Sequence, residues 1–596
     1  MTREAYRNTS GENKPSLKLG NGSRIGIVGG GPSGTFMAYF LLDLAERVGI
    51  DIHVDIYEKQ NFMTCGPQGC NRCGGIVSES LVQHLSAEGI TIPANVIRRG
   101  IDSYTLHTDV GGIRIETPLQ EKRIAAMYRG AGPLGSSSTE WRSFDNFLLE
   151  LTIEKGARVV KELVSSISTD DDLPVITTKK GTPASYDLVV GAVGLNPASL
   201  KLFGSLDFGY NPPETTKTFI CEFLLNEANV QKCFGNSMHV FLLNIPHLEF
   251  AAIIPKVNYV TLVLLGTNID KELVEQFLQN PEVKNCFPDG FIDTQSHQCQ
   301  CYPKINVGTA AQPFNDRIVL VGDCATTKLY KNGIGAAFLA AKAAATTAVF
   351  HGISKDDFQE HYWSVCEKID YDNSIGKMIF AGTKIIQKTG FTKRAILRMV
   401  AREQKWEGKE RGMSTVLWDT FTGSSSYRDI ILRAMNIPFI LTLGWDLFCS
   451  ILPGKNKKMT SNVNAHPDSL GKIYKPGETI IQQGDTGSNM FVIQSGTVEI
   501  IQGKNGSEVC LAELSEGEFF GEMALFERDV RSSTVRAKGE ARVITLDKNT
   551  LMGRVQEDPT LAFHLMQKMS NRLRELNSQV SRIRSDDRRD WLSRND

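Results

Sequence analysis

The stretch "RIGIVGGGPSGTFMAYFLLDLAERVGIDIHVDIYEK", residues 24–59, decides the fold of the N-terminal half. An apolar strand runs into Gly29-x-Gly31-x-x-Gly34, a helical segment follows, and a second strand closes on Glu58. Gly29 permits a tight turn, Gly31 lets the backbone approach a pyrophosphate, and Gly34 allows the helix to pack closely on the strand. Free N–H groups at the helix start would hold the phosphates, and Glu58 would accept the ribose hydroxyls of an adenosine. The stretch predicts an α/β, Rossmann-like domain that binds a dinucleotide.

A second stretch, "NDRIVLVGDCATTKLYKNGIGAAFLAAKAAATTA" at 315–348, identifies the kind of dinucleotide. An apolar strand precedes Gly322-Asp323, and a turn with Gly333 and Gly335 opens an Ala-rich helix. Asp323 would meet ribityl hydroxyls while the helix N-terminus faces the electron-rich edge of a flavin. The pair of stretches, about 300 residues apart, resembles the flavoprotein superfamily of p-hydroxybenzoate hydroxylase and, more closely, the geranylgeranyl reductases, in which both bind one FAD.

Three further stretches bear on this resemblance. "WRSFDNFLLELTIEKGARVV" (141–160) resembles a family helix whose arginine contacts FAD, which gives Arg142 that role. "YDLVVGAVGLN" (186–196) resembles a hydroxylase strand that ends in Gly-Ala-Asp-Gly, but Val193 replaces the aspartate, which counts against a monooxygenase. "FAAIIPKVNYVTLVLLG" (250–266) predicts paired strands, either of the family's substrate sheet or of a generic antiparallel sheet.

The glycine-rich loop "TCGPQGCNRCGG" contains three cysteines, Cys65, Cys70 and Cys73. Geranylgeranyl reductases carry a cysteine followed by glycine near the flavin, so the resemblance implies that Cys73 is a catalytic thiol that orients or protonates the substrate carbon after hydride transfer. The C-x4-C-x2-C spacing is also that of plant-type iron–sulfur proteins, with Cys299 or Cys301 as a fourth ligand. Ordinary thiols of a cytosolic protein are the third interpretation.

Composition bounds the other function classes. A chain of 596 residues is expected to form roughly three to four folding units. The 66 Lys and Arg residues and 67 Asp and Glu residues nearly cancel, which argues against nucleic acid as a partner. The polar N-terminal segment lacks the apolar core of a secretory signal, and we expect a cytoplasmic protein whose twelve cysteines do not form a disulfide framework.

The region between 351 and 453 combines basic amphipathic and apolar stretches. "FTKRAILRMVAREQK" (391–405) is basic and periodic, and "IPFILTLGWDLFCSIL" (437–452) is apolar but too short to span a membrane. The apolar stretch is either a core helix or a segment that dips into a membrane surface. Together the two would line a tunnel or rest peripherally on a membrane, as suits an isoprenoid substrate, or they would form a helical subdomain that caps the flavin.

Residues beyond 465 predict a small β-roll, because short β-rich runs alternate with Gly and Asp turns every eight to twelve residues. An amphipathic helix follows Pro559, with one apolar face formed by Leu561, Leu565, Met569, Leu573 and Leu576. The whole resembles the cyclic nucleotide-binding domain of the catabolite activator and of protein kinase regulatory subunits. There the helix is a moving lid or a dimer interface, so a homodimer is one expected assembly. No helix-turn-helix follows, which argues against a transcription factor.

The stretch "GEFFGEMALFERDVRSSTVRA" (517–537) carries the matching site. The resemblance implies nucleotide contacts at Gly521, Glu522, Ala524, Arg531 and Ser532. Backbone N–H groups from Gly521 onward would meet the cyclic phosphate, Glu522 would take the ribose 2′-hydroxyl, and Arg531 would pair with a phosphate oxygen. Ser532 resembles the residue of cAMP-type receptors at this position more than the Thr of those that prefer cGMP, so the resemblance implies cAMP over cGMP.

These observations predict the following organisation: a disordered tail (1–22), an FAD-binding oxidoreductase domain (23–350) with an interleaved substrate sheet (about 215–300), a helical subdomain (351–453), a linker (454–466), a cyclic nucleotide-binding domain (467–582) and a charged tail (583–596). The leading hypothesis is a geranylgeranyl reductase-like, FAD-dependent oxidoreductase that reduces an isoprenoid or similar hydrophobic substrate, draws electrons from NAD(P)H and is regulated by cAMP or cGMP. The alternatives are a cyclic nucleotide receptor with a flavoprotein scaffold or redox sensor, and a flavin monooxygenase.

Overall fold

The computed structural model describes residues 17–66, 70, 72–117, 121–133, 141–294, 299–405, 411–451, 470–503, 508–523, 530–557, 560–563, 565–574 and 577–578. The predicted linker and charged tail, and most of the predicted N-terminal tail, lie outside these residues. The chain divides into two compact units: unit 1 comprises residues 1–81, 93–120 and 124–469, and unit 2 comprises 82–92, 121–123 and 470–596.

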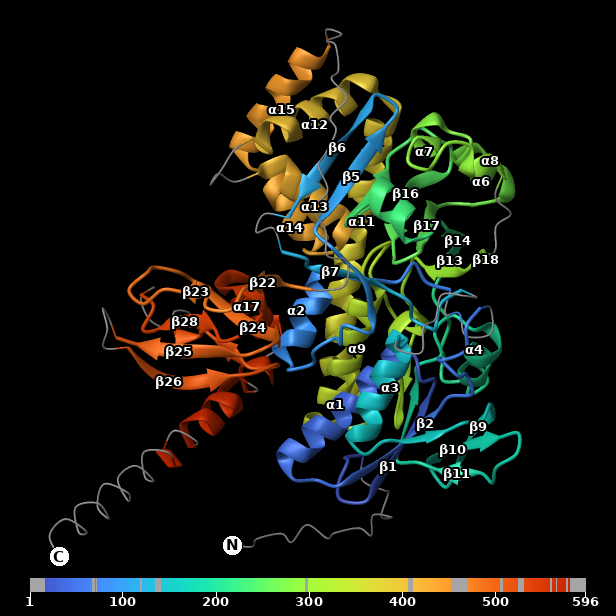
Figure 1. Ribbon diagram of the computed structural model, residues 1–596. Coiled ribbons are helices and arrows are strands. Elements are labelled where there is room, and N and C mark those ends of the chain that lie inside the picture. The colour runs from blue at the N-terminus through green and yellow to red at the C-terminus, as the bar shows by residue number, and fades with distance from the viewer. Residues whose placement is uncertain are drawn as a thin grey trace, which may run out of the picture. The chain divides into compact units, whose positions relative to one another are not determined.

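A six-stranded sheet forms the base of unit 1 (Figure 1). Its order is β20 (Phe314–Asn315), β21 (Ile318–Leu320), β12 (Leu188–Gly191), β1 (Ser23–Val28), β2 (Ile52–Tyr57) and β8 (Arg158–Val160). All neighbours are parallel except β20 and β21. Because strands that alternate with helices in one chain pair in parallel, the β1-helix-β2 pattern builds this Rossmann-like sheet, and the predicted fold class is confirmed.

Two helices lie together against this sheet, α1 (Pro32–Val48) and α9 (Gly333–Thr346). Alanines along α9 leave room for the rings of α1, and the Phe338 ring lies 5.2 Å from Phe36 and 5.1 Å from Phe40, edge-on to both. In the part of the chain that the structure describes, the segment Gly333–His351 is the one single helix long and apolar enough to span a membrane. It is a core helix here, because 61% of it is buried against its neighbours.

A seven-stranded sheet forms the other half of unit 1. Its order is β18 (Cys299–Cys301), β14 (Phe219–Leu224), β17 (Tyr259–Gly266), β16 (Leu248–Pro255), β15 (Ser237–Phe241), β5 (Ser103–Thr108) and β6 (Gly111–Glu116). The predicted strand pair at 250–266 is β16 with β17, antiparallel. Alternation along β16 places Phe250 and Ile254 in a core on one face and Ala251 and Ile253 in a core on the other.

Helices cover both faces of this sheet. One core includes residues of α5 (Glu227–Cys233), α6 (Lys271–Leu278) and α7 (Pro281–Lys284), with α8 (Phe291–Thr294) packed against it. The opposite core includes residues of α11 (Trp363–Lys388), α12 (Gly390–Glu403), α13 (Gly412–Thr422) and α14 (Tyr427–Ala434), with α15 (Ile437–Ser450) packed at its edge. These last five helices stand together in Figure 1 in yellow to orange.

The remaining elements of unit 1 are short. Two three-stranded sheets are β11 (Ala184–Ser185), β10 (Leu173–Thr178) and β9 (Val164–Asp170), and β3 (Ile76–Val77), β7 (Ile124–Met127) and β4 (Ile97–Ile101). A two-stranded sheet pairs β13 (Thr215–Lys217) with β19 (Lys304–Asn306). The other helical segments are α2 (Glu79–Ala87), whose C-terminal part belongs to unit 2, α3 (Phe144–Glu154), α4 (Pro197–Gly204), η1 (Gly322–Cys324), η2 (Thr347–His351), α10 (Lys355–Asp357) and η3 (Phe358–Tyr362).

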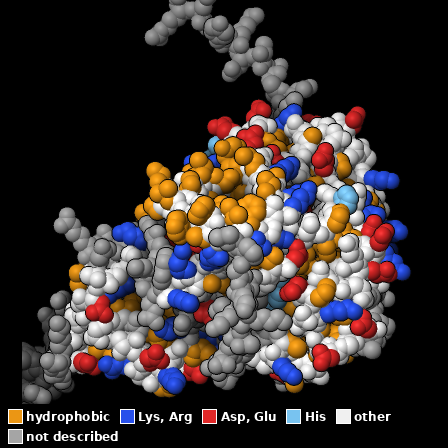
Figure 2. Space-filling model, turned by 90° about the horizontal axis from the view of Figure 1, so that it is seen from above, with side chains coloured by type: hydrophobic (Ala, Val, Ile, Leu, Met, Phe, Trp, Pro, Cys, Tyr) orange, Lys and Arg blue, Asp and Glu red, His pale blue; other side chains and the backbone are white. Residues whose placement is uncertain are grey.

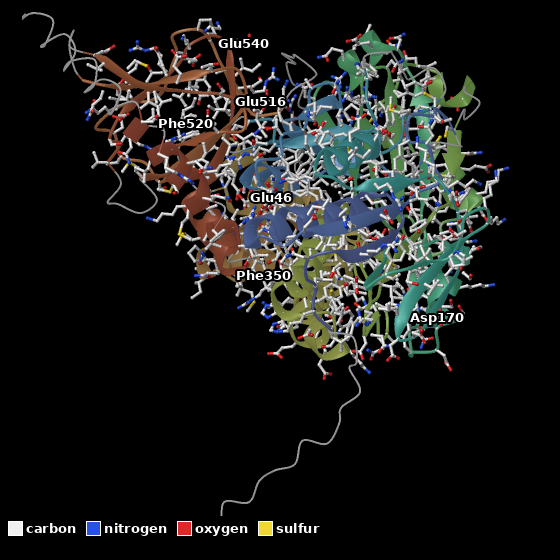
Figure 3. The ribbon with its side chains drawn as sticks, turned by 90° about the horizontal axis from the view of Figure 1, so that it is seen from below. Glu46, Asp170, Phe350, Glu516, Phe520 and Glu540 are labelled. Atoms are coloured by element: carbon white, nitrogen blue, oxygen red, sulfur yellow. The ribbon has the colours of Figure 1, made fainter. Side chains whose placement is uncertain are left out.

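Unit 2 contains the predicted β-roll. One sheet has the order β22 (Lys472–Tyr474), β29 (Ala541–Asp547), β24 (Asn489–Ser495), β27 (Phe519–Phe520), and the other β23 (Thr479–Ile481), β28 (Thr534–Ala537), β25 (Val498–Gln502), β26 (Val509–Leu514). Phe520, labelled in Figure 3, stacks on Phe491 at 5.2 Å within the roll core. Helix α17 (Lys548–Glu557) follows, and residues 560–563 and 565–574 are helical as predicted. Leu561 and Leu565 are buried, whereas Leu573 is exposed and Leu576 lies outside the described residues.

Candidate functional sites

The glycine turn between β1 and α1 is closed so tightly that side chains cannot enter it. Gly29 has φ +109°, and a Cβ at Gly34 would lie 1.9 Å from the Gly29 carbonyl oxygen. Helix α1 begins at Pro32, and its N-cap residue Gly31 provides no side-chain hydrogen bond to the first N–H groups. A turn of this shape presents backbone donors to an anion at a helix N-terminus. The residues therefore fit the pyrophosphate of a dinucleotide.

Glu58 directly follows β2 and reaches back to the glycine turn. Its Oε2 accepts a hydrogen bond from the Gly30 N–H at 2.9 Å, and its Oε1 accepts one from the Gln60 N–H at 2.6 Å. Burial raises the pKa of the Glu58 carboxyl, an effect that these two hydrogen bonds oppose. The carboxylate thus lies beside the turn, where the adenosine ribose of a bound dinucleotide would be.

The two glycine stretches meet in space. Gly322 lies against the start of α1, because a Cβ on it would be 1.9 Å from the Ser33 Oγ. Asp323 follows in η1, and burial raises the pKa of its carboxyl, while the hydrogen bond with Thr327 and the charge of Arg129 act in the other direction. One site therefore combines the pyrophosphate turn and the predicted ribityl contact, although the two stretches are far apart in sequence.

The N-terminus of α9 is built by Asn332. Its Oδ1 accepts hydrogen bonds from the Gly335 N–H at 3.1 Å and from the Ser78 Oγ at 2.6 Å, and its Nδ2 donates to the Ser80 Oγ at 2.9 Å. Gly333 is the first residue of the helix. The predicted turn with Gly333 and Gly335 thus forms a helix N-terminus whose position is fixed by two hydroxyls at and just before the start of α2.

Arg129 is the arginine that the structure brings to the glycine turn. Its Nη2 lies 3.3 Å from the position that a Cβ on Gly31 would take, and its guanidinium makes two bonds with the fully buried Asp145, at 3.1 and 2.8 Å. Burial acts to lower the pKa of Arg129, but the Asp145 carboxylate outweighs it, so the pKa is raised and the charge is secure. Arg142 is instead half exposed and pairs with Glu150 at 2.9 Å. Spacing alone gave no signal for Arg129.

The loop with Cys73 lies near a buried lysine that sequence reasoning missed. The Cys73 Sγ accepts a hydrogen bond from the Gly75 N–H at 3.4 Å, and a Cβ on Gly75 would be 3.3 Å from the Lys256 Nζ. Lys256 directly follows β16. It is the one lysine of the apolar stretch 250–266, and that isolated charge was the sequence signal that could have identified it.

Lys256 is held in a polar cluster, the Lys256 cluster, with Glu222, Thr261 and Tyr128. Its Nζ lies 3.4 Å from the Glu222 Oε1 and 3.9 Å from the centre of the Tyr128 ring, and Thr261 donates to Glu222 at 2.8 Å. Burial lowers the pKa of Lys256 and raises that of Glu222, and each partner's charge opposes the shift of the other. Such a group can lose and regain a proton more readily than an exposed lysine.

The three loop cysteines do not gather around one point. Cys65 donates from its Sγ to the Ala131 carbonyl oxygen at 3.7 Å, and the Cys70 Sγ accepts from the Arg72 N–H at 3.3 Å. Among the described residues, the one group of His, Cys and acidic side chains with all ligand atoms within 4.8 Å of one another lies elsewhere. Burial raises the pKa values of Cys299 and Cys301, and the neighbouring Cys70 adds to both shifts, which puts the loop near the predicted fourth-ligand positions.

In unit 2, Arg531 is buried and held by backbone oxygens. Its Nη1 donates to the Gly521 carbonyl at 3.1 Å and its Nη2 to the Asn489 carbonyl at 2.9 Å. Burial lowers the pKa of the guanidinium. Ser532 is adjacent and Glu522 follows Gly521, whereas Ala524 lies outside the described residues. Four of the five residues predicted to contact the nucleotide thus lie within the described part of the chain, and Arg531 lies against Gly521.

Residues 472–558 match the family model described as "Cyclic nucleotide-binding domain". They form a cyclic nucleotide-binding domain. Over 78 residues the chain is 40% identical to the cAMP-dependent protein kinase regulatory subunit of Schizosaccharomyces pombe. These residues make up 13% of this chain and 18% of that protein. Over 112 residues it is 29% identical to the cAMP-activated global transcriptional regulator CRP of Pasteurella multocida, 18% of this chain and 54% of that protein. The match thus spans only about a fifth of the kinase regulatory subunit and about half of the regulator.

Solved structures are also similar to this chain. A geranylgeranyl bacteriochlorophyll reductase-like protein from Thermoplasma acidophilum aligns with a TM-score of 0.49 and 14% identity, over 72% of this chain and 99% of that one.

The helix after the cyclic nucleotide-binding domain holds the predicted ribose ligand. The Arg572 Nη1 lies 3.6 Å from the Glu522 Oε1, and its Nη2 donates to the Phe519 carbonyl at 3.0 Å. Lys568, one turn earlier, donates to the Gly517 carbonyl at 2.9 Å. A cavity of about 180 Å³ lies along this contact, lined by Glu518, Phe519, Lys568, Met569, Asn571 and Arg572. In this conformation Glu522 is therefore paired with the helix.

Proposed function

We propose that the protein is an FAD-dependent oxidoreductase, similar to geranylgeranyl reductases, that reduces an isoprenoid or a similar hydrophobic substrate under the control of a cyclic nucleotide. The observation that carries the proposal is the meeting of the two glycine stretches at Gly322 and Ser33. That contact supports a single site with one acid from each stretch, Glu58 and Asp323, as a cofactor with a ribose at one end and a ribityl chain at the other would require. A dinucleotide without a ribityl chain would not need Asp323.

The residues divide the binding of FAD among them. The N–H groups at the start of α1 would hold the pyrophosphate, Glu58 the adenosine ribose and Asp323 the ribityl chain. Arg129 would add a permanent positive charge beside the glycine turn, because Asp145 keeps it protonated and oriented. The N-terminus of α9, fixed by Asn332, would favour negative charge on the flavin. When bound and reduced by NAD(P)H, FAD would supply hydride to the substrate.

The Cys73 loop and the Lys256 cluster would supply the proton. Reduction of a carbon–carbon double bond adds a hydride to one carbon and a proton to the other. Cys73 would orient the substrate carbon or relay the proton, and Lys256 is a buried cation whose pKa burial lowers and whose proton Glu222 helps to retain. The chain would also exclude water from the reacting carbons through the apolar core of the seven-stranded sheet around this cluster.

Cyclic nucleotide binding would change two contacts within unit 2. The cyclic phosphate would replace the Gly521 and Asn489 carbonyls as the partner of Arg531, and the ribose would replace Arg572 as the partner of Glu522. The second exchange would remove one of the contacts that hold the C-terminal helix to the domain, beside those of Arg572 with Phe519 and of Lys568 with Gly517. Helix α2 would carry the signal toward the flavin. Its second residue, Ser80, accepts a hydrogen bond from Asn332 at the start of α9, and the same helix continues into residues 82–92 of unit 2.

The apolar face of α15 supports a membrane surface as the place where a lipid substrate is met. Arg402 pairs with the buried Asp446 at 2.6 Å, and Arg394 donates to the carbonyl of the buried Ser450 at 3.3 Å. The helix thus turns its polar side inward and its apolar side to solvent. The exposed residues of this apolar patch are Leu432, Met435, Ile437, Ile440, Leu441, Trp445, Phe448 and Ile451. Figure 2 shows hydrophobic side chains gathered at this end of unit 1, with Lys and Arg at the border.

A patch of eight exposed apolar side chains bordered by cations fits the headgroup boundary of an anionic membrane. Sedimentation with phosphatidylcholine vesicles, with and without phosphatidylserine, tests whether the patch binds a membrane. The wild type is expected to sediment, and the double change Trp445→Glu and Phe448→Glu is expected to reduce binding more than about tenfold, since each buried apolar side chain contributes roughly 1.5–3 kcal/mol. Ile153→Glu, an exposed apolar change on α3, is the matched control. Equal sedimentation of both variants would refute the assignment.

The function itself is tested on the purified full-length chain. We expect a yellow protein whose flavin is reduced by NADPH or NADH and reoxidised by an isoprenoid with reducible double bonds, at a rate that changes when cAMP or cGMP is added. A colourless protein that still binds cyclic nucleotide would favour a receptor with a flavoprotein scaffold. Reoxidation that requires O2 and yields a hydroxylated product would favour a monooxygenase.

A further inference from the structure

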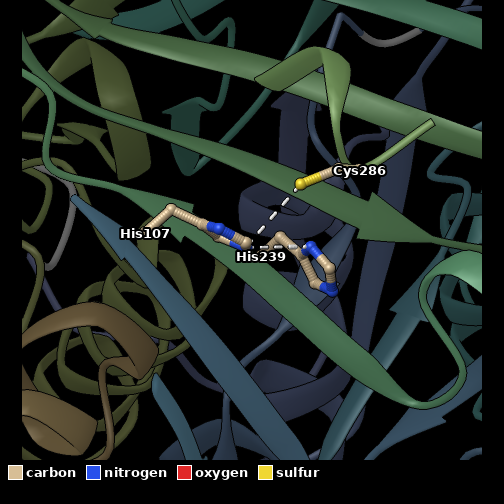
Figure 4. A group of neighbouring side chains, drawn as sticks. All are labelled: His107, His239 and Cys286. Atoms are coloured by element: carbon tan, nitrogen blue, oxygen red, sulfur yellow. Dashed lines mark hydrogen bonds between the residues drawn. The ribbon is translucent and has the colours of Figure 1, made fainter. Parts of the chain in front are cut away.

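Two histidines and a cysteine meet inside the seven-stranded sheet of unit 1, away from the glycine turn. His107 lies on β5 and His239 on β15, two strands that pair in parallel with Phe241 opposite His107. Cys286 follows the short helix α7. Figure 4 shows the three side chains directed toward one another from these segments. None of them takes part in the proposed oxidoreductase chemistry.

The three possible ligand atoms already have the spacing of a metal site. The His107 Nε2 lies 3.1 Å from the His239 Nδ1 and 3.8 Å from the Cys286 Sγ, and all three atoms are within 4.8 Å of one another. A tetrahedral Zn²⁺ ion with Zn–N near 2.0–2.1 Å and Zn–S near 2.3 Å separates its ligands by about 3.3 Å for two nitrogens and about 3.6 Å for nitrogen and sulfur. The observed spacings are near these values, so a small shift of Cys286 would close the site.

The surroundings hold both imidazole rings in place. Phe241 stacks on His107 with ring centres 4.6 Å apart, and Phe234 lies 4.9 Å from His239, which fixes the ring orientations. Imidazoles whose orientation is already fixed lose less freedom when a divalent ion binds.

Cys286 provides the sulfur ligand that zinc prefers. Its thiol now donates to the Glu282 carbonyl at 3.2 Å. A bound Zn²⁺ would displace the thiol proton to solvent and take the thiolate as a ligand.

We propose that His107, His239 and Cys286 bind one Zn²⁺ ion with a fourth position left to water. The ion would join two strands of the sheet to the segment after α7, within the apolar core that α5, α6 and α7 cover. Two nitrogens and one sulfur as the ligand atoms favour Zn²⁺ over the hard ions Mg²⁺ and Ca²⁺, which take oxygen ligands.

The test compares full-length variants after treatment with EDTA and dialysis against Zn²⁺. Elemental analysis is expected to find about one zinc per chain in the wild type. Cys286→Ser is expected to lose more than about 100-fold in zinc affinity, because even partners outside the coordination sphere are worth 10–100-fold. Cys221→Ser, which changes another buried thiol of the same sheet with a raised pKa, is the matched control and is expected to keep its zinc.

Co²⁺ provides a readout that does not depend on activity or on the stability of one variant. In the wild type, Co²⁺ is expected to give tetrahedral d–d bands and a thiolate charge-transfer band, and the latter should vanish in Cys286→Ser. His239→Gln is a second variant that should lose the ion. A wild type that takes up no zinc, equal uptake by Cys286→Ser, or loss of zinc in Cys221→Ser would overturn the proposal.

Discussion

Replacing Arg531 by Ala should abolish useful cyclic nucleotide binding while leaving the flavin in place. In the structure the guanidinium makes two hydrogen bonds to carbonyl oxygens, one to Gly521 at 3.1 Å and one to Asn489 at 2.9 Å. We expect the cyclic phosphate to take over these donors. A hydrogen bond to a charged group is worth about 1.5–3 kcal/mol. Two such bonds, less the cost of releasing the carbonyls, leave about 3 kcal/mol, or roughly a 150-fold rise in Kd.

Isothermal titration of cAMP into the full-length protein measures this effect. Arg536→Ala is the matched control, because Arg536 lies on β28 close to Arg531 in sequence but makes only surface pairs, with Glu508 at 3.3 Å and Glu499 at 3.8 Å. Arg531→Lys, which keeps the charge but loses the planar fork, should fall between the two. The reasoning is wrong if Arg531→Ala binds cAMP within threefold of the wild type, or if Arg536→Ala loses as much.

Three other changes test separate parts of the structure. Gly322→Ala should purify with little FAD, because the added Cβ would meet the Ser33 Oγ. Gly204→Ala, where the space around the added Cβ is open, is the control and should stay yellow. Equal FAD content in the two variants would contradict the proposed FAD site. Arg572→Ala should raise cAMP affinity about two- to tenfold, because it frees Glu522 from a partly buried pair that is 3.6 Å long, and Arg574→Ala should not raise it. A loss of affinity in Arg572→Ala would show that the helix helps to hold the nucleotide. Burial lowers the pKa of Lys331 from 10.5 to about 7. Between pH 7 and 10 the lysine is therefore protonated in the unfolded chain but neutral in the folded one, so the free energy of unfolding should rise with pH over this range. Lys331→Met should flatten that rise, as measured by urea titration.

Local spacing was enough to predict the glycine turn and the short strands of the β-roll, and the resemblance of that pattern to a known family identified the cyclic nucleotide-binding domain. In each case the residues that act together are close in the chain, and a required geometry limits the residue types, as Gly34 shows with its 1.9 Å approach to Gly29. The meeting of Gly322 with α1 was predictable only through the family resemblance, because nothing in the spacing of the two stretches brings them together.

Arg129 shows where local reasoning ends. Both Arg129 and Arg142 precede α3 in the chain, and only the second stands in a recognisable motif. Yet Asp145 on α3 is fully buried and binds Arg129, which directs that guanidinium to the glycine turn and leaves Arg142 to pair with Glu150. The choice between the two depends on which arginine the fold brings opposite one buried carboxylate, and sequence spacing does not contain that information. Lys256, a single charge in an apolar strand pair, did leave a visible signal.

The helix α15 and the histidine pair depend on long-range structure in opposite ways. For α15 the composition was plain, but whether its apolar side faces a core or solvent is decided by the arginines of α12, which bind Asp446 and the Ser450 carbonyl. For His107 and His239 the composition gives nothing, since 132 residues separate them. They meet because β5 and β15 pair in parallel, in a register that sets Phe241 opposite His107 and His239 two residues earlier. A shift of one residue would send one imidazole to the other face of the sheet and leave no nitrogen pair, so the proposed zinc site is a direct consequence of that register.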